Sequence, residues 1–155
     1  NLQTVTTNQQ AIASLLDDKD YSVSCGGSYC AGNVYAYVYP TDQSHTIYVC
    51  GAFWNASDSG YDSRPGVLVH EASHFVDVAD TDDHKYGMSG CLDLAADDPD
   101  KAVENADSYE YFNEAIWDEE FVQPVNALCS FSGGGAGLAG ALAGTLLTLL
   151  RRRRE

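Results

Sequence analysis

The sequence has 155 residues, of which 45% are apolar and 11% aromatic, so it can bury the core of one domain and not comfortably of two. Acidic side chains number 23 against 8 basic ones, and the terminal run 151–154 contains half of the basic ones. Residues 1–150 carry 4 basic and 22 acidic side chains, a formal charge of −18. This charge excludes binding to a phosphate backbone and favours cationic partners such as lysine-rich peptides or metal ions.

The predicted elements combine helices with a small hairpin. Apolar faces or capping residues predict helices over 7–16, 67–78, 87–96 and from Asp98 to about Asn113. Runs rich in Tyr, Val and Ile predict two strands, 34–39 and 46–49, which flank a turn at 40–44 as in a hairpin. The remaining polar stretches predict loops at 57–66 and 80–83.

One motif with metal-ligand spacing lies in the helix predicted over 67–78. His70-Glu71-Ala72-Ser73-His74 is an HExxH motif. Because positions i and i+4 share one helix face, both imidazoles can reach a single zinc ion, and Glu71 is placed to take a proton from water. The alternative interpretation of the bare motif is a pair of surface histidines beside a helical glutamate.

Two histidines leave a catalytic zinc ion one protein ligand short, so the third ligand decides the class of enzyme. The HExxHxxGxxH arrangement fails, because Asp77 and Asp80 stand where its glycine and third histidine would be. Spacing alone leaves these third ligands open: Asp80, Asp82, Asp83, His84, Glu104 and Glu110.

The segment after the motif carries a family resemblance. HExxH followed by Thr81-x-Asp83-x-x-Tyr86-Gly87 resembles the aspzincin metalloendopeptidases, the family of deuterolysin and peptidyl-Lys metalloendopeptidase, with Asp80 in place of the first glycine of its GTxDxxYG signature. Other family-like segments are 35–40, 49–54, 98–103 and 105–112, so the resemblance covers about residues 20–115. It implies an α+β, zincin-like metalloprotease domain over residues 1–128, without some of the N-terminal helices that are usual in the family.

The resemblance also implies a catalytic site. One zinc ion per chain is expected to be held by His70, His74 and Asp83, with water as the fourth ligand. Glu71 is expected to act as general base, and Tyr86 to stabilise the developing oxyanion together with the metal.

Substrate preference is expected to depend on two acidic side chains. In the lysine-specific branch of the family, an aspartate and a glutamate at the positions of Asp107 and Glu110 line the pocket for the residue after the cut. The resemblance therefore implies a secreted zinc endopeptidase that cuts on the amino side of lysine. Three alternatives stay open: an ordinary acidic helix face, a membrane-tethered acidic module that binds calcium or other cations, and an inactive remnant.

Five cysteines without a CxxC pair indicate disulfides in an exported protein. The resemblance implies a Cys30–Cys50 disulfide that ties the two hairpin segments together. It leaves Cys25 without its usual partner, so Cys25 is expected to be free. Cys91 and Cys129 have no counterpart in the family and are available to pair with each other.

Residues 129–155 are predicted to form a separate C-terminal segment. A Gly-rich break at 132–135 precedes an uncharged stretch that runs to Leu150 and then the Arg cluster 151–154. Counted from Phe131, the apolar run has 20 residues. A helix of this length would span about the thickness of one bilayer core. The pattern resembles Gly-Gly-type sorting signals of Gram-negative bacteria. It implies export, transient membrane insertion and a sorting protease as partner; a buried Ala/Gly/Leu helix is the alternative.

Overall fold

The computed structural model describes residues 1–116 and shows an α+β fold, as predicted. In chain order its elements are α1 (Leu2–Asp18), β1 (Ser22–Cys25), β2 (Ala36–Tyr37), β3 (Thr46–Val49), the 3-10 helix η1 (Ala52–Asn55), α2 (Arg64–Ser73), α3 (Met88–Asp97), α4 (Pro99–Val103) and α5 (Ala106–Ile116).

The sheet has three strands in the order β1-β3-β2. Strands β2 and β3 are antiparallel, with Tyr37 opposite Tyr48, so the predicted hairpin is confirmed. Strand β1 pairs in parallel with β3 and is an addition to the prediction. Its sequence, Ser-Val-Ser-Cys, contains one β-branched residue, and none of its four side chains is fully buried, so the sequence gives no strand signal there.

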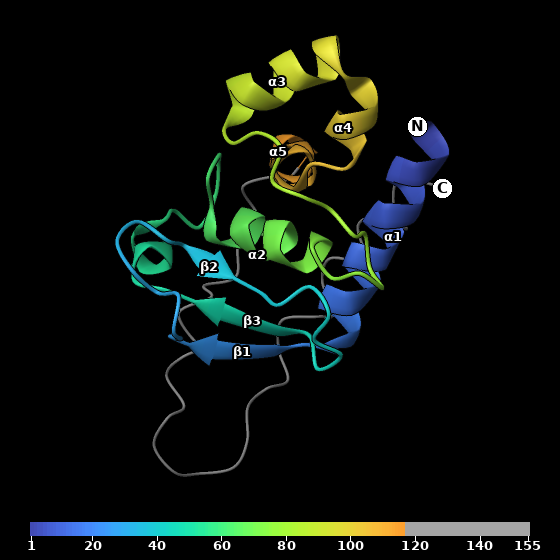
Figure 1. Ribbon diagram of the computed structural model, residues 1–155. Helices are drawn as coiled ribbons and strands as arrows, with labels where there is room; N and C mark the ends of the chain where they lie inside the picture. The colour runs from blue at the N-terminus through green and yellow to red at the C-terminus, as the bar shows by residue number, and fades with distance from the viewer. Residues whose placement is uncertain (117–155) are drawn as a thin grey trace.

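Helix α2 lies between the sheet and α5, with α1 along one side (Figure 1). Ile47 and Val49 of β3 face it and are almost fully buried. Phe53 and Phe75 fill the space beside them with no exposed surface, and Ile12 packs in from α1. The helix that carries the HExxH motif is therefore held by apolar packing on several sides.

The bounds of α2 differ from the prediction at both ends. It begins at Arg64 because the side chain of Ser63 accepts a hydrogen bond from Gly66 N, which caps the helix three residues earlier than expected. It ends at Ser73 because the next turn closes on itself: the Phe75 carbonyl accepts hydrogen bonds from three following backbone N–H groups. This turn sends the chain back across the end of α2.

The predicted single helix from 98 to about 113 is wrong, because the chain forms α4 and α5 with a break between them. The start is confirmed: Asp98 caps α4 and Pro99 occupies its first turn. At the break, Asp82 N donates to the Glu104 carbonyl at 2.7 Å, and Ala106 N donates to the Asp82 carbonyl at 3.0 Å. A loop from elsewhere in the chain thus takes up the backbone groups that a continuous helix would have used.

The cysteines confirm one expected disulfide, contradict the expectation for Cys25 and decide the state of Cys91. Cys30 and Cys50 form a disulfide with a Cα–Cα distance of 5.1 Å, as predicted. Cys25 is also disulfide-bonded, so the expectation that it is free is wrong. Cys91 is a free thiol buried in α3, where Asn105 Nδ2 lies 3.5 Å from its sulfur, so it does not form the disulfide with Cys129 that the sequence left open.

The predicted C-terminal segment, with Cys129, the apolar run and the Arg cluster, lies outside the described residues. Within residues 1–116, no helix has the length and apolar character needed to cross a membrane.

The turn between β2 and β3 allows a test by pH. The Asp42 carboxylate accepts hydrogen bonds from Ser44 N, Ser44 Oγ and Thr46 N, and mainly those from Ser44 lower the pKa of Asp42 from 3.8 to about 2. A lowered folded-state pKa stabilises the fold above the unfolded value, and this stabilisation is lost as pH falls through the folded value. The Asp42→Ala variant is therefore expected to melt below the parent protein at neutral pH, with the gap closing between about pH 4 and pH 2. Thermal melts against pH test this, with exposed Asp93→Ala as control; a gap that does not change with pH contradicts it.

Candidate active site

A cavity of about 620 Å³ opens between α2, α5, the segment around β2 and the loop that follows α2. All seven residues that the sequence singled out for catalysis, metal binding and substrate binding line it. The fold therefore brings into one cavity residues that lie up to 40 positions apart in the sequence.

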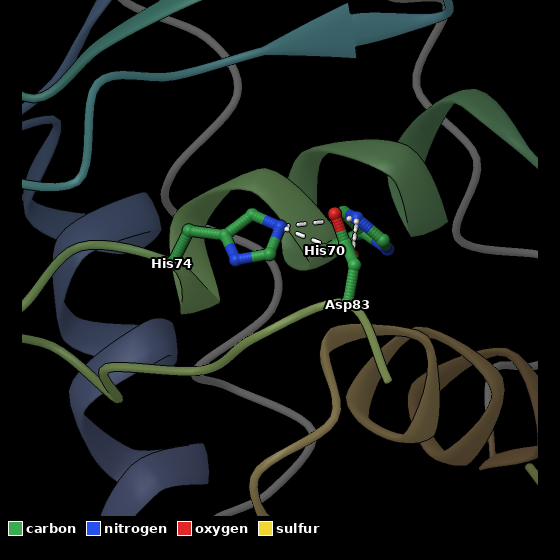
Figure 2. Close-up of side chains that lie close together, drawn as sticks. All are labelled: His70, His74 and Asp83. Atoms are coloured by element: carbon green, nitrogen blue, oxygen red, sulfur yellow. Dashed lines mark hydrogen bonds and ion pairs between the residues drawn. The ribbon is translucent and has the colours of Figure 1, made fainter. Parts of the chain in front are cut away.

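The two histidines of the motif and one aspartate converge in this cavity (Figure 2). His70 lies in α2 and His74 is the C-cap residue of this helix, one turn later; their Nε2 atoms are 3.2 Å from each other. Asp83 comes from the loop after α2, and its Oδ1 lies 3.2 Å from His70 Nε2 and 3.5 Å from His74 Nε2. Of the third ligands left open by spacing, Asp83 is the one that meets both imidazoles.

The loop that carries Asp83 is fixed at both ends. Buried Thr81 contacts Ser73 through its backbone N and its hydroxyl, which lies 2.6 Å from Ser73 Oγ. On the other side, the amide oxygen of fully buried Asn105 accepts a hydrogen bond from Lys85 N at 2.8 Å. Sequence reasoning did not single out Ser73 or Asn105, because a single sequence does not distinguish a buried polar side chain from an exposed one.

The outer nitrogens of both imidazoles face acceptors. His74 Nδ1 lies 2.9 Å from the Thr81 carbonyl oxygen, so this nitrogen carries the proton and donates it. His70 Nδ1 lies 2.7 Å from Asp107 Oδ1 and 3.3 Å from Glu110 Oε2. Each histidine is thus arranged to keep its proton on Nδ1 and to turn the lone pair of Nε2 toward the other and toward Asp83.

This donor set fits a tetrahedral zinc ion. Zinc bonds to imidazole nitrogen and carboxylate oxygen are ~2.0–2.1 Å long, so two ligand atoms of a tetrahedral site lie ~3.3 Å apart. The three atoms of His70, His74 and Asp83 are separated by 3.2, 3.2 and 3.5 Å. No group of metal-ligand type within residues 1–116 includes Asp80, Asp82, His84 or Glu104.

The electrostatics of the cluster also favour a cation. Burial lowers the pKa of His70, but its contacts with Asp107, Asp83 and Glu110 outweigh burial and hold that pKa well above its ordinary value. Burial opposes the lowering of the Asp83 pKa, yet the two imidazoles and the Tyr86 hydroxyl hold that pKa well below its usual range. The carboxylates around the histidines therefore stabilise positive charge at this position.

Glu71 and Tyr86 line the cavity together with the cluster. The Glu71 side chain is buried, lines the cavity, and has its pKa raised mainly by burial. Tyr86 is 67% exposed, and its ring stacks at 6.3 Å from the His70 ring. Burial and the neighbouring Asp83 raise the pKa of Tyr86, so its hydroxyl remains a hydrogen-bond donor.

Asp107 and Glu110 form a buried acidic wall behind His70. Each is 5% exposed, and the Asp107 Oδ2 atom also accepts a hydrogen bond from Gly87 N at 2.7 Å. Burial is the main cause that raises the pKa of Glu110 to about 7. These two side chains thus contact His70 and also line the cavity. The sequence analysis did not predict their contact with His70.

An α+β fold whose HExxH helix meets a loop aspartate in this way defines a class of metallopeptidase-like proteins. The sequence matches the family described as lysine-specific metallo-endopeptidase over residues 1–114, and the chain belongs to this family, the aspzincins. Membership implies a zinc cofactor.

Similar proteins support this placement. An extracellular protease of Aeromonas hydrophila is 47% identical over 70% of this chain and 30% of its own length. A peptidyl-Lys metalloendopeptidase of Armillaria mellea is 50% identical over 61% of this chain and 26% of its own length. A solved zinc peptidase from Grifola frondosa has a TM-score of 0.65 and 45% identity, covering 72% of this chain and 66% of that one. The chain thus spans less than a third of these two curated relatives.

Asp80 provides a test of the loop. It stands where the family signature has glycine, and it adopts a φ of 49°, a conformation that costs a non-glycine residue about 1 kcal/mol. Asp80→Gly is expected to keep zinc binding and to change the free energy of unfolding by at most about 1 kcal/mol, in the stabilising direction. Asp80→Val is expected to destabilise by about 1–2 kcal/mol, because a β-branched side chain disfavours this conformation further. Thermal unfolding and zinc titration test both variants; loss of zinc binding in Asp80→Gly would instead make Asp80 a ligand.

Proposed function

We propose that this chain is a zinc-dependent endopeptidase that hydrolyses peptide bonds on the amino side of lysine. The observation that supports this most is the match between the separations of the His70, His74 and Asp83 ligand atoms and a tetrahedral zinc site, with Glu71 buried beside it. The names of the Aeromonas, Armillaria and Grifola relatives agree with a peptidase, and the Armillaria name agrees with lysine as the target.

In this proposal, His70, His74 and Asp83 hold the zinc ion. The metal, when bound, supplies Lewis acidity that activates water and polarises the scissile carbonyl. Glu71 takes the proton from the attacking water and passes it to the leaving amine. Tyr86, which is exposed and lines the cavity, donates a hydrogen bond from its hydroxyl to the developing oxyanion.

Asp107 and Glu110 are proposed to recognise the substrate lysine. Both line the cavity, and both are buried, so their charge acts in a medium less polar than bulk water. An ammonium group on a flexible four-carbon stem fits such a narrow acidic wall better than a forked guanidinium does. The contacts of the two carboxylates with His70 support a lysine site next to the metal ligands.

We further propose that the protein is secreted, which agrees with the extracellular Aeromonas relative and the Cys30–Cys50 disulfide. The C-terminal apolar run and Arg cluster are proposed, from sequence alone, to act as a membrane-inserted sorting signal in a Gram-negative exporter.

The test is digestion of an unfolded protein rich in lysine and arginine, with and without added zinc, followed by mass spectrometry of the new N-termini. Fragments that begin with lysine and form only with zinc are expected. Zinc-dependent cuts without a lysine bias would keep the metal site and refute the acidic pocket. No cleavage by a folded, zinc-loaded chain would refute the enzyme and favour an inactive, cation-binding module.

A further inference from the structure

One buried carboxylate in the α2–α5 interface takes no part in the mechanism above. Glu114 lies near the end of α5 and is 7% exposed. Its Oε1 accepts hydrogen bonds from Ser63 N at 2.8 Å and from Ser63 Oγ at 2.7 Å, and its Oε2 accepts one from Asp62 N at 3.2 Å. A side chain of α5 therefore binds the residues that start α2.

These partners are the cap of the HExxH helix. Ser63 Oγ, held by Glu114, accepts the hydrogen bond from Gly66 N at 3.1 Å. The first N–H groups of a helix have no partners within it, and its N-terminus carries partial positive charge, so a carboxylate here satisfies donors and opposes that charge. Glu114 completes from another helix a cap that Ser63 alone would leave partial.

Glycine at position 66 brings the two helices close together. A methyl group at Gly66 would overlap Glu114 Oε1 and lie 3.1 Å from Glu110 Cγ. A side chain at position 66 would therefore displace the Glu114 carboxylate from the start of α2. Gly66 thus leaves room for the contact of Glu114 with Ser63 that joins α5 to the start of α2.

The same face of α5 carries the acidic wall. Asp107, Glu110 and Glu114 follow the i, i+3, i+7 spacing of one helix face. The first two contact His70 Nδ1, and the third binds the cap of the helix to which His70 belongs. Any slide of α5 along α2 at the Glu114 end also moves Asp107 and Glu110 relative to the metal ligands.

We propose that Glu114 is a positioning residue that fixes the register of α2 on α5 and so sets the preference for lysine. This inference rests on the proposed function. Glu114 touches neither substrate nor metal; it holds the acidic wall at a set distance from the scissile bond. A displacement of about 1 Å in such an arrangement costs on the order of 100-fold in rate.

The experiment compares the N-termini released by the unaltered chain and by the variants Glu114→Ala, Glu114→Gln and Gly66→Ala, with Asp93→Asn on the exposed surface of α3 as a control for lost charge. We expect Glu114→Ala and Gly66→Ala to lower the ratio of cleavage before lysine to cleavage before arginine by about tenfold or more, with zinc stoichiometry unchanged. Glu114→Gln should keep most of the preference, because its amide oxygen still accepts from Ser63.

The outcomes distinguish a positioning role of Glu114 from a purely structural one, and both from failure of the proposed function. A purely structural role would lower the melting temperature and the active fraction, and leave the lysine-to-arginine ratio as in the unaltered chain; that result overturns the inference. An unaltered ratio in folded Gly66→Ala overturns it even if Glu114→Ala does not fold. If the unaltered chain does not cut before lysine, the proposed function fails, and that failure is seen before any variant is compared.

Discussion

Replacing Glu71 with glutamine is expected to lower kcat by about 10²–10⁴-fold while zinc still binds. Glutamine keeps the shape of the side chain but cannot accept a proton from water at neutral pH. Because Glu71 is buried on α2 between the two histidines in sequence, this isosteric change disturbs the packing little. The loss therefore reports proton transfer, and it should appear in kcat with little change in KM.

The measurement is the steady-state hydrolysis of a peptide with one lysine, together with the zinc content of the purified protein. His74→Ala serves as the contrasting variant, because it removes a proposed ligand and should lose both zinc and activity. Normal turnover by Glu71→Gln with bound zinc would rule out Glu71 as the general base.

The parts of the fold that follow a local pattern could be predicted, and those that depend on distant partners could not. The hairpin and α3 follow from residue type and spacing, and the structure confirms them. The break between α4 and α5 depends on Asp82, which lies more than 20 positions earlier and takes the backbone bonds of Glu104 and Ala106. No local pattern in 98–113 reveals such a partner.

The candidate site shows the same division. His70 and His74 share a helix face by spacing alone, so their meeting could be predicted. The choice of Asp83 over Asp80 needed the family resemblance, because both lie in one acidic loop. The structure adds the reason: Thr81 is bound to Ser73 and to His74, and this attachment orients the next turn of the loop.

The two acidic residues of α5 are expected to divide between metal binding and substrate choice. Asp107 is the nearer to His70 Nδ1, at 2.7 Å against 3.3 Å for Glu110, and it is also held by Gly87 N. Carboxylates that orient a metal-binding histidine typically contribute 10–100-fold to metal affinity. Asp107→Asn is therefore expected to weaken zinc binding by about this factor, whereas Glu110→Gln should weaken it less.

Substrate choice should show the opposite order. Glu110 is the carboxylate that contacts His70 less closely, so removing its charge should mainly affect the substrate. The loss of one buried charge pair with a lysine ammonium corresponds to about 2–3 kcal/mol, or about 30–150-fold in selectivity.

Competition with a zinc chelator measures the change in zinc affinity. The ratio of cleavage before lysine to cleavage before arginine measures the change in selectivity. Equal losses in both assays for both variants would contradict this division, because each carboxylate would then serve both the metal site and lysine recognition. An unchanged lysine ratio in Glu110→Gln, with zinc bound, would require the lysine to be recognised elsewhere in the cavity, where Asp62 and Asp82 are the remaining exposed carboxylates of the described lining.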